Sequence, residues 1–280
     1  MNVKIVSVIL VLALASIACG FTVDLPTLRQ AGPEVKETIE VADPKSDETR
    51  LRLSFGAGKL TLSPGAKSLV DGTAIYNVSD LKPEVIEDDA EVTIKQGNFQ
   101  QLPPFEGMKN EWDFRLGESP MDLVIEAGAY DGDFELGGLA LNSLSVSDGA
   151  ADVRISFSEP NLVEMSMLSY TTGASDVTIE GLANANFKRF IFNGGAGDYT
   201  LDFSGDLQQD STVSIDSGLS DLRLIIPSGV SAVVTIDGAL VDINVGDGWS
   251  RRGNTYTQKG DGPTLTIIIN MGAGEITITD

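Results

Sequence analysis

The chain repeats a short alternation of hydrophobic and polar positions at a nearly constant interval. Each copy has seven positions: a glycine, a small or apolar residue, a small residue, an aspartate, an apolar residue, any residue and a second apolar residue. Copies begin at Gly149, Gly173, Gly195 and Gly218, which lie 24, 22 and 23 residues apart. The apolar, any, apolar ending has the two-residue period of a strand with one buried face. A repeat of this length indicates a solenoid whose coils stack on their neighbours.

The anchor glycine sets the geometry that we expect for each coil. Glycine adopts the positive φ values that a Cβ opposes, so we expect these four glycines to occupy left-handed corners. A corner and short strands, repeated about every 22 residues, wind into coils that stack ~4.8 Å apart. The predicted fold class is therefore all-β, a single-stranded right-handed β-helix or solenoid.

The aspartates of the repeat should form a column along the coils. Such a column could be a metal-binding ladder, or a set of turn carboxylates that cap backbone N–H groups and face water. We favour turn carboxylates. The calcium-binding nonapeptide roll has a tighter repeat and a residue between its last glycine and the aspartate, whereas Gly197 directly precedes Asp198 here. We predict no metal site and no cofactor.

The repeat also suggests how the chain is organised. In order, we expect a signal peptide, a flexible tether with several prolines, an N-terminal β region and the main solenoid, at residues 1–19, 20–48, 49–120 and 121–280. An insertion at 246–263 interrupts the period before the last copy of the repeat.

Residues 1–19 have the features of a secretion signal. Lys4 supplies positive charge, and the apolar run from Ile5 to Ala18 is 14 residues long, too short to span a bilayer comfortably. The small residues before Cys19 resemble the lipobox of bacterial lipoproteins, although Ser16 replaces the usual leucine. We predict an extracytoplasmic protein whose lipid-modified Cys19 anchors it to the bacterial cell membrane. The alternative is an ordinary cleaved signal.

Several segments together resemble a known family. They are Gly56–Leu60, Gly72–Tyr76, Pro83–Val85 and Glu111–Phe114, followed by the glycine-anchored repeats. The combination is similar to the bacterial toast-rack family, whose function is unknown. The C-terminal halves of its members resemble cell-wall-active antibiotic response proteins and candidate adhesins. The resemblance covers most of residues 49–280; it implies the stacked-strand fold and no catalytic residue.

Composition restricts the chemistry that the chain can perform. There is no histidine and only one cysteine, Cys19, which excludes Ser-His-Asp triads, Cys-His pairs and zinc sites built on histidine or cysteine. Removing residues 1–18 removes one lysine and no acid, which leaves 41 acidic and 18 basic residues and a net charge of −23. This charge argues against nucleic acid and anionic lipid surfaces as partners.

One loop contrasts with this acidic body. The insertion contains Trp249, Arg251, Arg252 and Tyr256, which form the candidate partner loop because aromatic residues and arginine are enriched at interfaces. The alternative is a hairpin whose aromatic side chains shield the end of the solenoid. We expect a non-enzymatic, adhesin-like binding or scaffolding protein whose partner is an envelope protein or a glycan. The alternative is a carbohydrate-active β-helix enzyme or a polysaccharide-binding module.

Overall fold

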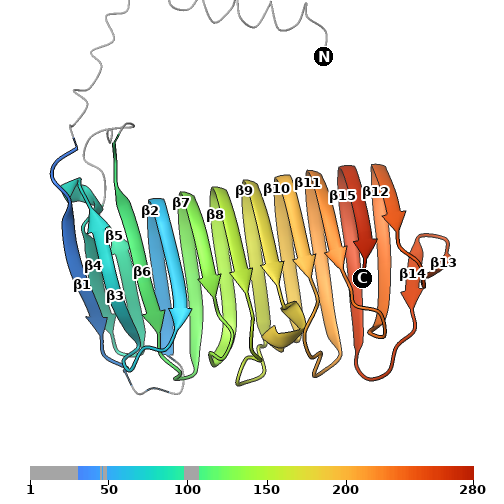
Figure 1. Cartoon of the computed structure of the whole chain (residues 1–280), viewed down its shortest axis with the longest axis horizontal. Helices are drawn as coiled ribbons and strands as arrows, with labels where there is room; N and C mark the ends of the chain where they lie inside the picture. The colour runs from blue at the N-terminus through green and yellow to red at the C-terminus, as the bar shows by residue number, and fades with distance from the viewer. Residues whose placement is uncertain (1–30, 45, 47–48, 98–106) are drawn as a thin grey trace, which may run out of the picture.

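A computed structural model describes residues 31–44, 46, 49–97 and 107–280 (Figure 1). The predicted signal peptide, with Cys19, lies outside the described residues. The described chain forms a 15-stranded, mostly parallel sheet, and this confirms the predicted all-β solenoid. The strands are β1 (Val35–Val41), β2 (Thr49–Pro64), β3 (Val70–Tyr76), β4 (Pro83–Asp88), β5 (Glu91–Gln96), β6 (Asn110–Leu116), β7 (Met121–Glu135), β8 (Leu141–Ser156), β9 (Met167–Glu180), β10 (Arg189–Asp202), β11 (Ser211–Ile225), β12 (Ser231–Val245), β13 (Ser250–Arg252), β14 (Thr255–Gln258) and β15 (Thr264–Thr279), with short 3-10 turns at Ser79–Leu81 and Leu182–Ala185.

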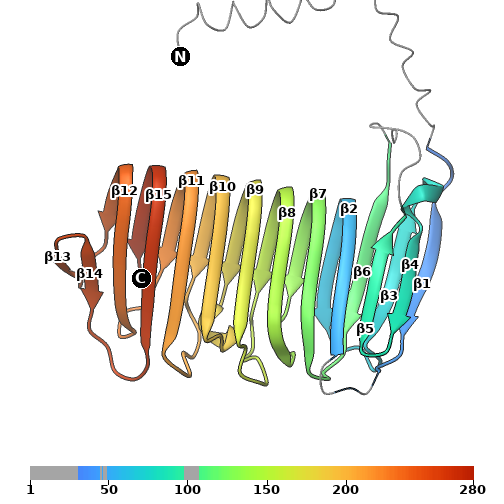
Figure 2. The same ribbon diagram turned by 180° about the vertical axis from the view of Figure 1, so that it is seen from behind.

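Each long strand bends once, and its two halves belong to opposite layers of the rack. In β2, residues 50–54 pair with β5 and residues 59–64 pair with β6, whereas both halves pair in parallel with β7. The two opposite views show the long ribbons passing over one edge of the rack, from one layer to the other (Figures 1 and 2). We call the layer of first halves sheet A and the layer of second halves sheet B.

The core fills the space between the two sheets. In β10, Phe190 and Phe192 are buried from sheet A, and Tyr199 and Leu201 are buried from sheet B. The rings of Phe192 and Tyr199 meet edge to face with their centroids 4.8 Å apart, a favourable geometry for an aromatic pair. The predicted alternation of buried and outward positions is therefore confirmed in this coil, on both sides of the bend.

The anchor glycines mark the bend, but the predicted left-handed corners are wrong. Gly149, Gly173, Gly195 and Gly218 do not have a positive φ. Instead, a Cβ on Gly173 would lie 2.5 Å from the carbonyl oxygen of Gly149, and a Cβ on Gly218 would lie 2.5 Å from that of Gly195. Successive coils are so close at this point that the neighbouring carbonyl occupies the volume of a side chain. We call this stack of residues the glycine ladder.

The last strand does not add to the end of the rack. β15 lies between β11 and β12 and is parallel to both. The chain therefore places β12 one position further along, turns through the β13–β14 hairpin, and returns to fill the gap. β12 and the hairpin, rather than the C-terminal strand, form this end of the molecule (Figure 1).

The predicted tether is wrong for its second half. β1 lies within residues 20–48, pairs antiparallel with β3 and buries Ile39 and Val41. The two apolar residues are two positions apart, so both face the core, and the prolines only flank the strand. In the described part of the chain, no helix is long and apolar enough to cross a membrane.

Glycine is required at the bend because the backbones of neighbouring coils are so close. Even the methyl group of alanine should therefore destabilise the bend. We expect Gly173→Ala to lower the free energy of unfolding by about 1–3 kcal/mol, because the added methyl group meets backbone that cannot rotate away. Urea denaturation with an unchanged m-value would measure this. Gly246→Ala is the control: its Cβ would lie 3.5 Å from the nearest atom, an ordinary contact. Equal stability of the two variants would contradict the explanation.

Candidate functional site

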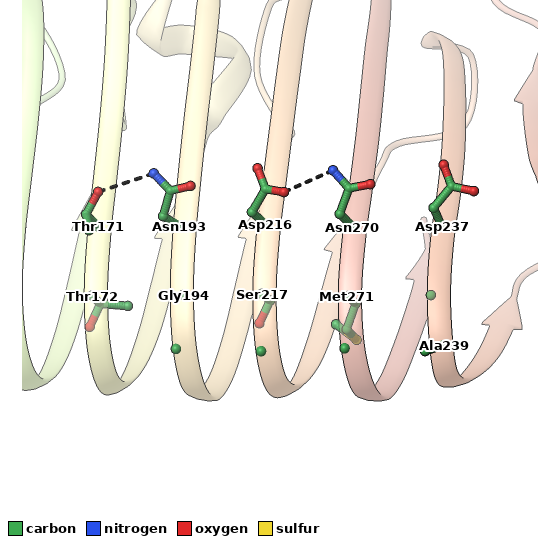
Figure 3. A pocket seen from close by; sticks show the side chains of 14 residues that line it. Thr171, Thr172, Asn193, Gly194, Asp216, Ser217, Asp237, Ala239, Asn270 and Met271 are labelled. Atoms are coloured by element: carbon green, nitrogen blue, oxygen red, sulfur yellow. Dashed lines mark hydrogen bonds between the residues drawn. The ribbon is translucent and has the colours of Figure 1, made fainter.

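A shallow groove of about 690 Å³ runs along the outside of the bend, across β9, β10, β11, β15 and β12 (Figure 3). Four intervals between adjacent strands give it a length of ~19 Å. One side is a row of polar side chains on sheet A, one from each strand. In spatial order they are Thr171, Asn193, Asp216, Asn270 and Asp237, and each is in register with the next.

Hydrogen bonds within the row use one of the two amide N–H groups of each asparagine. Asn193 Nδ2 donates to Thr171 Oγ1 at 3.4 Å, and Asn270 Nδ2 donates to Asp216 Oδ1 at 2.9 Å (Figure 3). Asp237 Oδ1 accepts from Asn254 Nδ2 at 2.8 Å. The remaining oxygens of the two carboxylates and of the two amides are acceptors. The groove therefore suits a ligand that donates hydrogen bonds, and it disfavours an anion.

The glycine ladder forms the floor of the groove. Gly195, Gly218 and Gly272 line it, and all three are exposed. Gly272 continues the ladder on β15, because a Cβ on it would lie 2.6 Å from the carbonyl oxygen of Gly218. Because these residues have no side chains, a ligand could approach the backbone closely. The same constraint that bends the coils therefore keeps the floor low beside the polar row.

A buried polar cluster lies inside the bend of β8 and β9. Asp148 is 8% exposed and accepts hydrogen bonds from Tyr170 Oη at 2.6 Å and from Ser175 Oγ at 3.2 Å. Thr172 Oγ1 lies 2.6 Å from Ser175 Oγ. A buried carboxylate with these partners is satisfied and enclosed, so we regard the cluster as structural support.

The tyrosines near this cluster stay protonated at neutral pH. Burial, and secondly the negative charge of Asp148, raise the pKa of Tyr130. Burial likewise raises the pKa of Tyr170, and it raises the pKa of Tyr199 to about 12. A phenol that does not ionise near neutral pH cannot act there as a general base.

The predicted acidic column exists on sheet B. Its members are all exposed, and each lies on the strand next to that of the preceding member. In spatial order they are Asp131, Asp152, Asp176, Asp198, Asp221, Glu275 and Asp242. The prediction that they face water is confirmed. The predicted capping of backbone N–H groups is wrong, because they lie within strands whose N–H groups pair with neighbouring strands. Within the described ranges, no group of three metal-ligating side chains is arranged to hold a metal ion.

The four residues of the candidate partner loop separate into an aromatic pair that contacts the core and an exposed pair of arginines. Tyr256 on β14 is 5% exposed and belongs to the core, and Trp249 packs against that core. Arg251 and Arg252 are exposed; the Arg251 guanidinium carbon lies 5.1 Å from the centre of the Tyr256 ring. Since β14 pairs with residues 232–235 of β12, the two aromatics cover the end of sheet A. Partner binding by the two arginines remains a prediction.

The sequence reading missed the polar row. The signal was present, because the residue two positions before each of Gly173, Gly195, Gly218 and Gly272 is polar. Two positions is the period of a strand, so these residues must lie in one outward column once the glycines are aligned. The repeat as described above includes the aspartate three positions after each glycine and omits the polar residue two positions before it.

Comparison with known proteins gives one family match. Residues 30–180 match the N-terminal domain of toast-rack, DUF2154. No curated protein matches the chain.

Several solved structures are similar to the chain at low sequence identity. A candidate cell adhesion protein from Clostridium sporogenes is 20% identical with a TM-score of 0.47, and the match covers 88% of this chain and 99% of that one. A candidate adhesin from Parabacteroides merdae is 11% identical with a TM-score of 0.38, covering 89% and 97%. A candidate lipid-binding protein from Parabacteroides distasonis is also 11% identical with a TM-score of 0.38, covering 89% and 98%. These similarities are too low to transfer an activity or a partner.

The two pairs of hairpin residues should respond differently to alanine. We expect Tyr256→Ala to lower the free energy of unfolding by about 3–5 kcal/mol, because it removes a buried aromatic ring from the end of the core. Arg252→Ala is the control on the same hairpin and should change stability by no more than about 0.5 kcal/mol. Thermal and urea unfolding would measure both. A stable Tyr256→Ala variant would show that the hairpin does not act as a cap.

Proposed function

The chain belongs to the toast-rack family, and we propose that it is a non-enzymatic, adhesin-like protein of the cell envelope whose groove binds a neutral, extended glycan. The observation that carries this proposal is the row of outward acceptors beside an exposed glycine floor. An open groove that crosses five strands fits a linear polymer better than a compact small molecule.

The chemistry of the groove favours hydroxyl-rich ligands. Asp216, Asp237 and the amide oxygens of Asn193 and Asn270 accept hydrogen bonds, and sugar hydroxyl and acetamido N–H groups donate them. The acceptors recur at ~4.8 Å along the groove, so a polymer could be contacted at successive units. The formal charge of −22 further disfavours uronic acid or phosphate polymers.

A glycan-cleaving enzyme is the second candidate, because Asp216 and Asp237 flank Asn270. With one strand between them, their Cα atoms are ~10 Å apart. This is near the carboxylate separation of about 6.5–9.5 Å in inverting glycosidases. However, both carboxylates are exposed in an open groove, and neither lies in the apolar enclosure that keeps a general acid protonated. Binding without cleavage therefore fits the groove better.

The first described strand after the proposed anchor, β1, lies at the end of the rack opposite to the groove. The anchoring residue would be Cys19, and the first strand begins at Val35. Sixteen residues reach at most ~55 Å when extended. β1 is at one end of the rack and the groove crosses the strands near the other end, so an anchor at Cys19 would attach the chain on the side of the rack remote from the groove (Figure 1).

Removal of the central acceptors should abolish most glycan binding. We expect the double variant Asp216→Ala with Asn270→Ala to bind chitohexaose at least tenfold more weakly. A hydrogen bond to the Asp216 carboxylate contributes about 1.5–3 kcal/mol, and one to the neutral Asn270 amide contributes about 0.5–1.5 kcal/mol. Isothermal titration calorimetry would measure affinity, and mass spectrometry of the mixture would detect cleavage.

The matched control is the double variant Asp221→Ala with Asn244→Ala, which removes an exposed acid and an exposed amide from sheet B. It should bind as the wild type does. Equal losses in the two double variants, or tighter binding of anionic polygalacturonate than of chitohexaose, would argue against the groove. Release of shorter oligosaccharides would instead support the enzyme.

The anchor can be tested separately. If Cys19 is diacylated, a clickable fatty-acid analogue should label the wild-type protein in bacteria, and Cys19→Ser should lose the label and accumulate unprocessed precursor. Label on both proteins, or on neither, would exclude the lipoprotein form without affecting the glycan proposal.

A further inference from the structure

The two sheets of the rack do not end at the same place. Sheet A continues past β12 through β14 and β13, whereas sheet B ends with the second half of β12. The hairpin pairs with β12 only at Ala232–Thr235, and Ile236 N–H donates to Asn254 O at 3.0 Å. Among the described strands, none pairs with residues 239–245 on the side away from β15. We call these residues the open edge (Figure 1).

The backbone of the open edge presents hydrogen-bonding groups. Gly246 N–H donates to Ile278 O of β15 at 2.9 Å. Because backbone groups alternate in direction along a strand, the N–H and C=O groups of Asp242 and Asn244 also point toward β15. The N–H and C=O groups of Val241, Ile243 and Val245 therefore point outward from the sheet edge. Natural edge strands are usually protected by lysine, proline or a bulge, and Ala239–Val245 contains no lysine and no proline.

The side chains of the open edge are also incompletely covered. Val241, Ile243 and Val245 face the core but are only partly buried, whereas Ile276 and Ile278, the partners of Ile243 and Val245 on β15, are 0% and 1% exposed. On the opposite, solvent-facing side of the same strand, Leu240 is 77% exposed. One more strand beside β12 would complete the cover of the core, because each interior coil is covered by such a neighbour.

Charge indicates what kind of strand would fit. The acidic column of sheet B ends at Asp242 on the open edge, beside Glu275. Toward the other end of sheet B, Lys59 of β2 is in register with Asp131 on one side and with Glu111 of β6 on the other, so a basic residue lies between two acids there. Like charges directly opposite each other on adjacent strands are destabilising, and opposite charges are stabilising. A strand added beside Asp242 should therefore present a basic residue to it.

We propose that the open edge, Ala239–Val245, is a docking site for an extended segment of a partner protein, which adds to sheet B as a further strand. The segment alternates apolar residues, which cover Val241, Ile243 and Val245, with lysine or arginine, which faces Asp242. A second copy of this chain fits less well, because pairing through the same edge would bring two acidic columns together. Strand addition of this kind combines backbone hydrogen bonds with side-chain selectivity.

Model peptides and a charge reversal test the proposal. The probes are a fluorescent heptapeptide that alternates valine with lysine, and the same peptide with glutamate in place of lysine. We expect the wild-type protein to bind the lysine peptide, and Asp242→Lys to weaken that binding about fivefold or more while improving binding of the glutamate peptide. Asp198→Lys is the matched control, since it makes the same reversal in the same column on an interior strand, and it should leave both affinities close to wild type.

Amide hydrogen exchange distinguishes strand addition from general charge attraction. The lysine peptide should slow exchange at Val241, Ile243 and Val245, whose N–H groups it would engage. Absence of peptide binding, equal effects of the two reversals, or binding without protection at these three amides would overturn the proposal. Sedimentation that reveals a dimer which the peptide does not dissociate would also overturn it, because a second copy would then occupy the edge.

Discussion

Successive coils of this protein touch backbone to backbone at the bend, where the carbonyl oxygen of one glycine occupies the volume that a Cβ on the next would need. The contact recurs from Gly149 to Gly173, Gly195 and Gly218. It fixes the register of the coils, since a shift by one residue would drive a side chain into that carbonyl and turn every buried residue outward. The layered core and the outward columns both depend on this contact.

The groove is a consequence of the same register. With the glycines aligned, the residues two positions earlier lie side by side on sheet A, and the exposed positions beside them in the bend are glycines on β10, β11 and β15 and Ala239 on β12. A row of acceptors beside bare backbone is thus produced by the repeat itself. Variation at these positions, from Thr171 to Asn193 and Asp216, would change the ligand without changing the coil.

The sequence was sufficient to predict the coils, because the glycine phrase and the alternation of residues such as Tyr199 and Leu201 report local geometry directly. It did not reveal why glycine is needed, since close approach and positive φ both select that residue. Nor did the period specify neighbours in space: β15 lies between β11 and β12, and β1 adds to the sheet from within the predicted tether. The polar row could be predicted from the sequence only if the anchor glycines of successive coils were known to stack directly against one another.

The most direct test of this account is amide hydrogen exchange of the wild-type protein with and without saturating chitohexaose. If the glycine ladder is the floor of a glycan groove, exchange should slow at Gly195, Gly218 and Gly272 and at the row residues beside them, and should not change at Ser250–Gln258 of the capping hairpin. Protection centred on the hairpin, or on the acidic face of sheet B, would contradict the account, because the ligand would then be held by a surface that the ladder does not create.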